Sequence, residues 1–143
     1  MPDLWLTLDV SHWVVVAERL LDDAADAQAL EPVIARVRHI QARVGYAQGP
    51  QVPHPAAPEY HQELQWHQAL WRQVWQSQRG AGDTRSTLTP EFGPDGYLQQ
   101  QPFGGPPVAD LWSLNHWMAQ EQRRQHVLWS SQAEHHQPSG VLS

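Results

Sequence analysis

The sequence predicts an α/β fold whose strands run parallel in one sheet. Three short apolar or β-prone runs, Leu4–Asp9, Val37–Val44 and Ser86–Glu91, are each followed by a helix-like segment. Strands that alternate with helices in this way lie side by side in a parallel sheet, because each helix returns the chain to the same end. The length of 143 residues fits a single domain.

The first strand is predicted from strict alternation of residue types. Every second residue over 4–9 is leucine, and the residues between are Trp, Thr and Asp. This is the period-2 pattern of a strand. Helical sequence follows over Trp13–Asp23, and a short second helix is expected at Leu30–Ala35, where Pro32 is tolerated in the first turn.

The second strand has one polar face and one mainly apolar face. His39, Gln41 and Arg43 alternate along the polar face. A barrel strand that packs on helices with its outer face, and turns polar towards the functional rim, has this pattern. A loop rich in Pro and Gly follows over 45–58, and Glu59–Arg79 then carries an apolar stripe at helical spacing.

The third strand ends at Glu91, in the segment Thr89–Pro94 (TPEFGP). Prolines on both sides of this carboxylate restrict the backbone, as expected where a side chain must be held in one direction. A second loop rich in Pro and Gly covers Phe92–Pro107, and a last helix is expected over Val108–His126. Residues 1–126 are therefore expected to form the folded part, and 127–143 a flexible tail.

Composition excludes several classes of function. The net charge of -6 argues against a nucleic-acid partner, which needs a basic face to neutralise phosphates. The sequence has no Cys, which excludes disulfides and thiolate chemistry. It has no apolar stretch near the roughly 20 residues of a membrane span, and its start lacks the pattern of a secretory signal, so a cytoplasmic location is expected.

Asp9, His39 and Glu91 are the candidate metal ligands. Three successive strand–helix units that each deliver one such side chain are how an α/β barrel assembles a divalent-metal site at one rim. A donor set made mostly of oxygen suits Mn²⁺ or Mg²⁺, and the imidazole also permits Co²⁺ or Zn²⁺. Two structural alternatives stay open: Asp9 as a helix N-cap, and His39, Gln41 and Arg43 as a hydrogen-bonded cluster.

Three stretches of the chain resemble the xylose-isomerase-like TIM barrels, and within them the sugar phosphate isomerase/epimerase branch. These are Leu8–Trp13 (LDVSHW), His39–Pro53 (HIQARVGYAQGPQVP) and Thr89–Tyr97 (TPEFGPDGY). The resemblance covers roughly Leu4 to Met118. It implies a partial (β/α)8 barrel, of which the chain supplies about the last three βα units.

The resemblance also implies a role for each candidate residue. Asp9, His39 and Glu91 would bind one divalent metal ion. His12 would hydrogen-bond a substrate oxygen, and Arg43 would bind substrate hydroxyls. Glu91 would also be one of two acid/base carboxylates that move a proton next to a carbonyl of a sugar or sugar phosphate, while the metal polarises that oxygen.

The family's first Glu ligand, which is also the second acid/base group, should precede Asp9 by one strand unit and has no counterpart here. The resemblance therefore implies the C-terminal part of an isomerase or epimerase that is incomplete or inactive alone, and it leaves open whether the chain is an enzyme. A complementing N-terminal half, or self-association through unpaired strand edges, is expected. The alternatives are a non-catalytic remnant or interaction module of the same fold, and an endonuclease IV-like metal phosphodiesterase, which the acidic charge disfavours.

Overall fold

The computed structural model describes residues 4–134, which form a three-stranded parallel sheet and four α-helices. The predicted α/β class with parallel strands is confirmed. The strands are β1 (Leu6–Leu8), β2 (Val37–Ala42) and β3 (Thr87–Pro90), in that order across the sheet. The helices are α1 (Ser11–Ala17), α2 (Ala24–Ile34), α3 (His61–Gly80) and α4 (Leu111–Glu134), and a 3-10 turn, η1 (Pro58–Tyr60), precedes α3.

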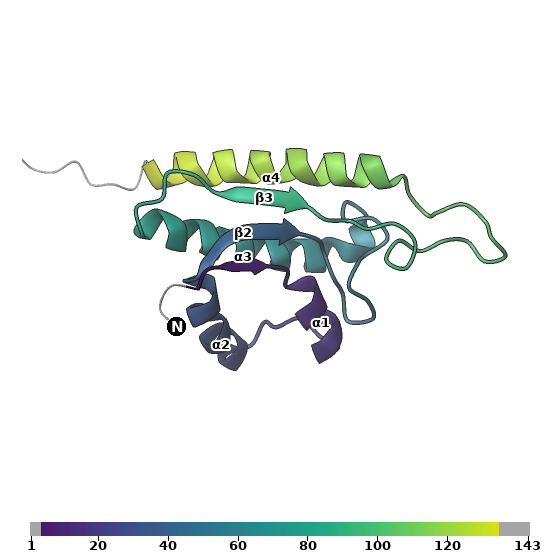
Figure 1. Cartoon of the computed structure of the whole chain (residues 1–143), viewed down its shortest axis with the longest axis horizontal. Helices are drawn as coiled ribbons and strands as arrows, with labels where there is room; N and C mark the ends of the chain where they lie inside the picture. Colours follow the sequence, from purple (N-terminus) through teal and green to yellow (C-terminus); the bar gives the residue numbers. More distant parts are fainter. Residues whose placement is uncertain (1–3, 135–143) are drawn as a thin grey trace, which may run out of the picture.

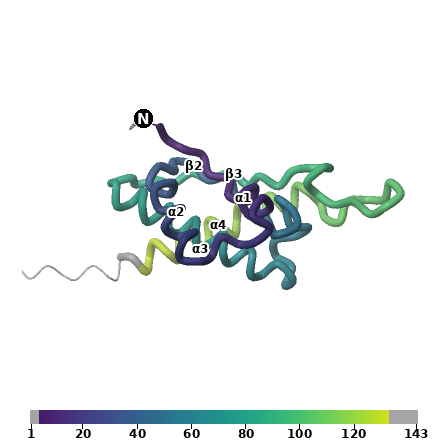
Figure 2. Tube along the Cα trace, turned by 90° about the horizontal axis from the view of Figure 1, so that it is seen from below, coloured from purple at the N-terminus to yellow at the C-terminus, as the bar shows by residue number. Residues whose placement is uncertain are grey.

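The helices lie on one side of the sheet and leave the other side open. In Figure 1, α4 runs along β3 while α1 and α2 lie beside β1, and Figure 2 shows the helices below the strands. The uncovered face carries the exposed side chains of Thr7, Thr87 and Thr89. Parallel sheets usually have both faces covered, so a face of polar residues is what allows this one to stay open.

The hydrophobic core lies between the sheet and the two long helices. Ile40 and Ala42 of β2 are fully buried there, as are Trp71 of α3 and Met118 of α4. Ile40 and Ala42 alternate with the polar His39 and Gln41, so this part of β2 turns its apolar side chains towards the helices, as the period-2 pattern predicts. Burial of apolar side chains in this layer is the main force that holds the helices on the sheet.

The first helical segment differs from the prediction of one helix over Trp13–Asp23. It ends at Ala17, because Glu18 adopts a left-handed conformation with φ of 53°. Asp23 then starts α2: its side chain accepts the Asp26 N–H at 2.8 Å, and the Asp26 side chain accepts the Asp23 N–H. This reciprocal capping box begins α2 at Ala24, well before the expected start at Leu30.

The last helix extends beyond the predicted end at His126 and continues to Glu134. Packing on α3 explains the extension: the Trp129 ring lies 5.8 Å from the Trp75 ring, and the Arg79 guanidinium lies 3.9 Å from the centre of the Trp129 ring. The expectation of a tail from residue 127 is thus wrong as far as residue 134, and 135–143 lie outside the described residues.

None of the helices formed by residues 4–134 combines the length and the apolar character needed to cross a membrane.

Gly45 allows the segment after β2 to pass close to the start of α1. A Cβ atom at this position would lie 2.7 Å from the carbonyl oxygen of Ser11 and 2.9 Å from its Cα. Gly45→Ala should therefore lower the free energy of unfolding by about 2 kcal/mol or more, because backbone atoms must move. Gly80→Ala is the matched control, since no atom lies within 4 Å of its added Cβ. Urea unfolding would check this, and equal effects of the two changes would contradict it.

His67 makes stability depend on pH in the acidic range. The side chain is fully buried, its Nδ1 bonds the Glu63 carbonyl at 2.8 Å, and its Nε2 accepts the Gly45 N–H at 3.2 Å. Burial lowers its pKa from 6.5 to about 4. Between pH 6.5 and about 4, His67 is protonated in the unfolded chain but stays neutral in the folded chain. The free energy of unfolding should therefore fall by about 3 kcal/mol as pH drops over this range.

Urea unfolding at several pH values would measure this fall. His67→Gln should reduce the dependence, and His61→Gln, an exposed position on the same helix, should retain it. A flat profile of wild-type stability over this pH range would show that His67 is not held neutral in the fold.

Candidate functional site

A cluster of charged side chains lies at the carboxyl ends of the three strands. Asp9 directly follows β1, Arg43 directly follows β2 and Glu91 directly follows β3. Because the strands are parallel, all three positions fall at the same end of the sheet. The carboxyl ends of parallel strands are where α/β proteins place their ligand sites.

Arg43 is the centre of this cluster. Its side chain is only 4% exposed, and its Nη2 donates to Oδ2 of Asp9 in a very short contact. Its Nε donates to the Ser11 hydroxyl at 3.0 Å, and its Cζ lies 4.6 Å from the centre of the Tyr97 ring. The other Asp9 oxygen accepts the Ser11 N–H at 3.0 Å and the Ser11 hydroxyl at 2.6 Å. The buried charge of Arg43 is therefore paired and hydrogen-bonded, as burial of an ion requires.

His12 lies at the outer side of this ion pair. Its Nε2 is 2.6 Å from Nη2 of Arg43 and 3.5 Å from Oδ2 of Asp9. Since a guanidinium only donates, the short contact requires Nε2 of His12 to be unprotonated. The ring is exposed and its edge meets the Tyr97 ring, with 6.3 Å between the ring centres. His12 can thus reach a molecule in solution while it contacts the buried pair.

The peptide groups that follow Glu91 are held by two amide side chains from other elements. Asn115 of α4 accepts the Phe92 N–H at 2.9 Å and donates to the Phe92 carbonyl at 3.0 Å. Gln51 does the same for Gly93, at 2.7 Å and 3.1 Å. These paired hydrogen bonds add to the rigidity expected from the prolines, and they fix the direction in which the Glu91 side chain leaves the backbone.

Glu91 has a partly buried carboxyl group with a raised pKa. Its Oε2 is buried without a hydrogen-bond partner among the residues described. Burial raises the pKa of this carboxyl, and the Asp9 carboxylate raises it further, while Arg43, His12 and His39 act in the opposite direction. A raised carboxyl pKa in a polar cluster is typical of groups that accept and return protons.

His39 lies deeper in the sheet than the sequence suggested. It is the third residue of β2 rather than a residue near the strand end. Its Nδ1 is 2.8 Å from the Thr87 hydroxyl and its Nε2 is 3.0 Å from the Thr89 hydroxyl. Thr87 donates its own proton to the Arg38 carbonyl, so Nδ1 of His39 is the donor and Nε2 accepts from Thr89. The lone pair that a metal would need is already engaged.

The register of the strands explains why the three predicted ligands do not converge. Leu8 of β1 pairs with Ile40 of β2, so Asp9 is level with Gln41, while His39 is level with Thr7. Within residues 4–134 no group of three or more His, Asp or Glu side chains is placed to hold a metal ion. With Asp9 bound to Arg43 and His39 bound to threonines, the donor set in this arrangement does not fit a divalent metal, and the metal site remains a prediction.

Two members of the cluster were not anticipated from the sequence. Ser11 lies two residues after Asp9, a spacing that favours a side-chain hydrogen bond to the local backbone and could have pointed to it. Tyr97 belongs to a loop far along the chain, and no sequence pattern connects its ring with Arg43. Of the predicted residues, the structure brings Asp9, His12 and Arg43 into direct contact, with Glu91 close enough to interact electrostatically.

Comparisons of the chain with protein-family models, with curated proteins and with solved structures found no match. Functional assignment therefore rests on the geometry of the site.

Arg43→Gln should be one of the most damaging single changes in the chain. It leaves the Asp9 carboxylate without its cation in a nearly buried position, so we expect a loss of about 3–5 kcal/mol in the free energy of unfolding. The double change Asp9→Asn with Arg43→Gln should recover part of this loss, because no uncompensated charge is left.

Arg124→Gln is the matched control: it breaks the 2.8 Å pair with Glu121, but the Arg124 side chain is 59% exposed, and Gln68 and Gln125 still donate to the Glu121 carboxylate. We expect a much smaller loss there, since solvent screens the charge of the exposed Arg124 and the carboxylate keeps its two amide donors. Urea unfolding of the wild type and the three variants would measure these effects, and a loss for Arg43→Gln no larger than for the control would contradict the central role of the pair.

Proposed function

We propose that the chain forms three consecutive units of a (β/α)8 barrel and contributes part of the site of a sugar or sugar phosphate isomerase or epimerase. The observation that supports this most is that Asp9, Arg43 and Glu91 each directly follow a parallel strand. Barrels of this kind carry their active sites at this end.

The form of the sheet supports the barrel part of the proposal. Strands that follow one another in the sequence are neighbours, the helices cover a single face, and the open face is polar. In a closed barrel the helix-covered face is the outside, and a polar face turned inward lines the end of the barrel near the site. The outer edges of β1 and β3 would pair with the strands that complete the barrel, whether these come from a complementing half or from further copies of the chain.

In the proposed reaction Glu91 removes a proton from a carbon next to the substrate carbonyl. The electron pair of the broken C–H bond forms a double bond to the carbonyl carbon, and the π pair of the C=O bond moves to the oxygen, which becomes the enediolate oxygen. Arg43 places a fixed positive charge beside this oxygen, and His12 offers a hydrogen-bonding nitrogen at the solvent side. Return of the proton to the other face, or to the neighbouring carbon, yields the epimer or the isomer.

The reaction of the family that the chain resembles also uses a divalent metal ion and a second acid/base carboxylate. The divalent metal implied by the resemblance enters no step, because Asp9 and His39 are engaged by other groups. The second acid/base carboxylate would come from a strand that precedes β1 in the barrel. The proposal therefore expects this chain to perform proton removal more readily than the complete interconversion of two sugars.

Solvent exchange separates proton removal from full turnover. Ketoses such as D-fructose or D-ribulose 5-phosphate would be incubated with the protein in D₂O, and loss of the proton signal next to the carbonyl followed by NMR. We expect exchange above the rate without protein, and a decrease of about 100-fold or more in Glu91→Gln. Exchange should rise with pH as Glu91, whose pKa burial raises, loses its proton.

Glu59→Gln is the matched control, because this exposed glutamate lies in η1, outside the cluster, and it should exchange like the wild type. Parallel samples with Mn²⁺ or Mg²⁺ would test the metal that the resemblance implies. Equal exchange in wild type and Glu91→Gln would refute the role of Glu91. No exchange under any of these conditions would favour the alternative of a non-catalytic module with the same fold.

A further inference from the structure

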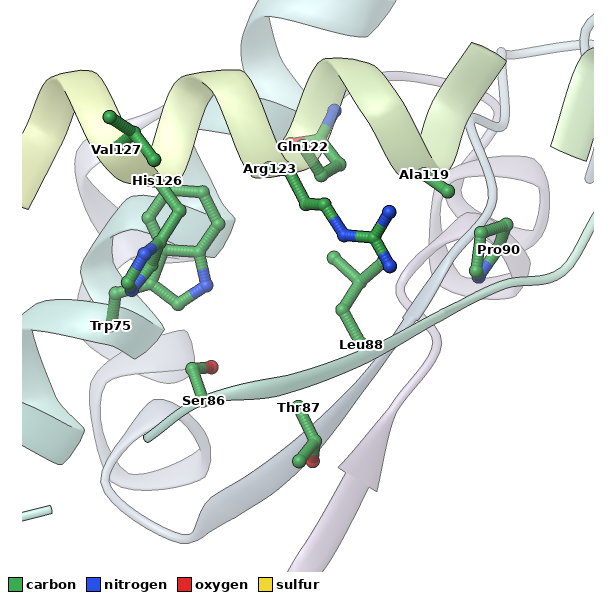
Figure 3. Close-up of a pocket in the computed structure, with 10 residues that line it drawn as sticks. All are labelled: Trp75, Ser86, Thr87, Leu88, Pro90, Ala119, Gln122, Arg123, His126 and Val127. Carbon is green, nitrogen blue, oxygen red and sulfur yellow. The ribbon is translucent and has the colours of Figure 1, made fainter. Parts of the chain in front are cut away.

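A cavity of about 530 Å³ opens between β3 and α4, at the outer edge of the sheet (Figure 3). Its walls are largely apolar, and the Arg123 side chain extends over Leu88. The residues that line it from the strand, from α3 and from α4 include Trp75, Leu88, Pro90, Ala119 and Val127. An apolar hollow along a strand edge is a place where another chain can pack.

The backbone of β3 along this cavity is free to pair. Glu91 donates its N–H to the Ala42 carbonyl of β2, so by alternation the N–H and the carbonyl of Leu88 point away from β2. Within the described residues these two groups have no hydrogen-bond partner. Pro90 has no N–H to offer, which limits but does not abolish the pairing capacity of this edge.

Two buried polar atoms beside the cavity also lack partners. They are the hydroxyl of Ser86 and Oε1 of Gln122, whose side chain is 3% exposed. Both residues line the cavity. Both atoms are covered by the protein itself, so they form a polar part beneath the cavity wall and would not contact an incoming strand.

The opposite edge of the same sheet exposes complementary features. Leu4 and Trp5, just before β1, are 52% and 54% exposed. Next to this edge the segment 18–31 carries five carboxylates and one arginine, whereas the segments beside the β3 edge, 79–90 and 119–128, carry four arginines and two carboxylates. One edge thus has protruding apolar side chains, with Arg38 stacked on Trp5 and an acidic segment beside them, and the other is basic with an apolar hollow.

We propose that copies of this chain associate head to tail, with the β1 edge of one copy added in parallel to the β3 edge of the next. Leu4 and Trp5 of the first copy would cover the cavity of the second, and acidic α2 would approach Arg123. This contact between copies is independent of the reaction proposed above, because it uses only the two edges of the sheet. A small molecule in the cavity would leave the Leu88 backbone unpaired, which is why a strand is the better occupant.

The experiment is sedimentation velocity of the full chain over a range of concentrations. Wild type should associate at about 100 μM or below, and less at high salt, because the two edges carry opposite charge. Trp5→Asp disables one edge and Val127→Asp the other. Both side chains are largely exposed, at 54% and 66%, so neither change should unfold the protein. Each should raise the dissociation constant at least about tenfold.

Mixing the two variants tests the head-to-tail arrangement itself. Each retains the edge that the other lacks, so the mixture should form a dimer that cannot grow further. Phe103→Asp, at a fully exposed position in the loop before α4 that does not line the cavity, is the matched control and should associate like wild type.

Three results would overturn the proposal. A wild type that stays monomeric at all concentrations would assign the β3 edge to a different polypeptide. Association unchanged in both variants would place the contact elsewhere. Failure of the two variants to pair with each other would show that the interface is symmetric rather than head to tail.

Discussion

The buried charge of Arg43 is the constraint on which the rest of the site depends. A guanidinium that is almost completely buried must have its donors satisfied. It meets this requirement with Asp9 from the end of β1, Ser11 from the start of α1 and the ring of Tyr97 from a distant loop. Three separate parts of the chain are therefore held in place by a single side chain at the end of β2.

The sequence was sufficient for the fold class because both periodicities were strong. Alternating leucines before Asp9 and the apolar stripe of α3 predicted strands that alternate with helices, and the structure has three parallel strands with helices between them. The predicted start of α2 and the predicted end of α4 were wrong, because specific side-chain contacts decide these positions and the apolar spacing does not. The Asp23 and Asp26 capping box starts a helix that apolar spacing does not reveal, and α4 continues through a polar stretch because Trp129 packs on α3.

For the candidate site, the sequence pointed to residues more readily than to their positions in space. Period 2 predicts which face of a strand a residue lies on, but β2 ends at Ala42, so this rule covers His39 and not Arg43. It does not tell how deep a residue lies, and register puts His39 one row below Asp9. The paired hydrogen bonds from Gln51 and Asn115 to the loop after Glu91 join segments far apart in sequence, which no single-sequence pattern could show.

Three arginines of this chain stack on aromatic rings at three different places. Arg38 lies over Trp5 at one edge of the sheet, Arg43 over Tyr97 at the site, and Arg79 over Trp129 between the long helices. The sequence contains no lysine, so every such contact uses a cation that keeps its proton far above neutral pH. Alkaline conditions that would discharge ammonium groups leave these three contacts intact, which favours retention of the fold in basic solution.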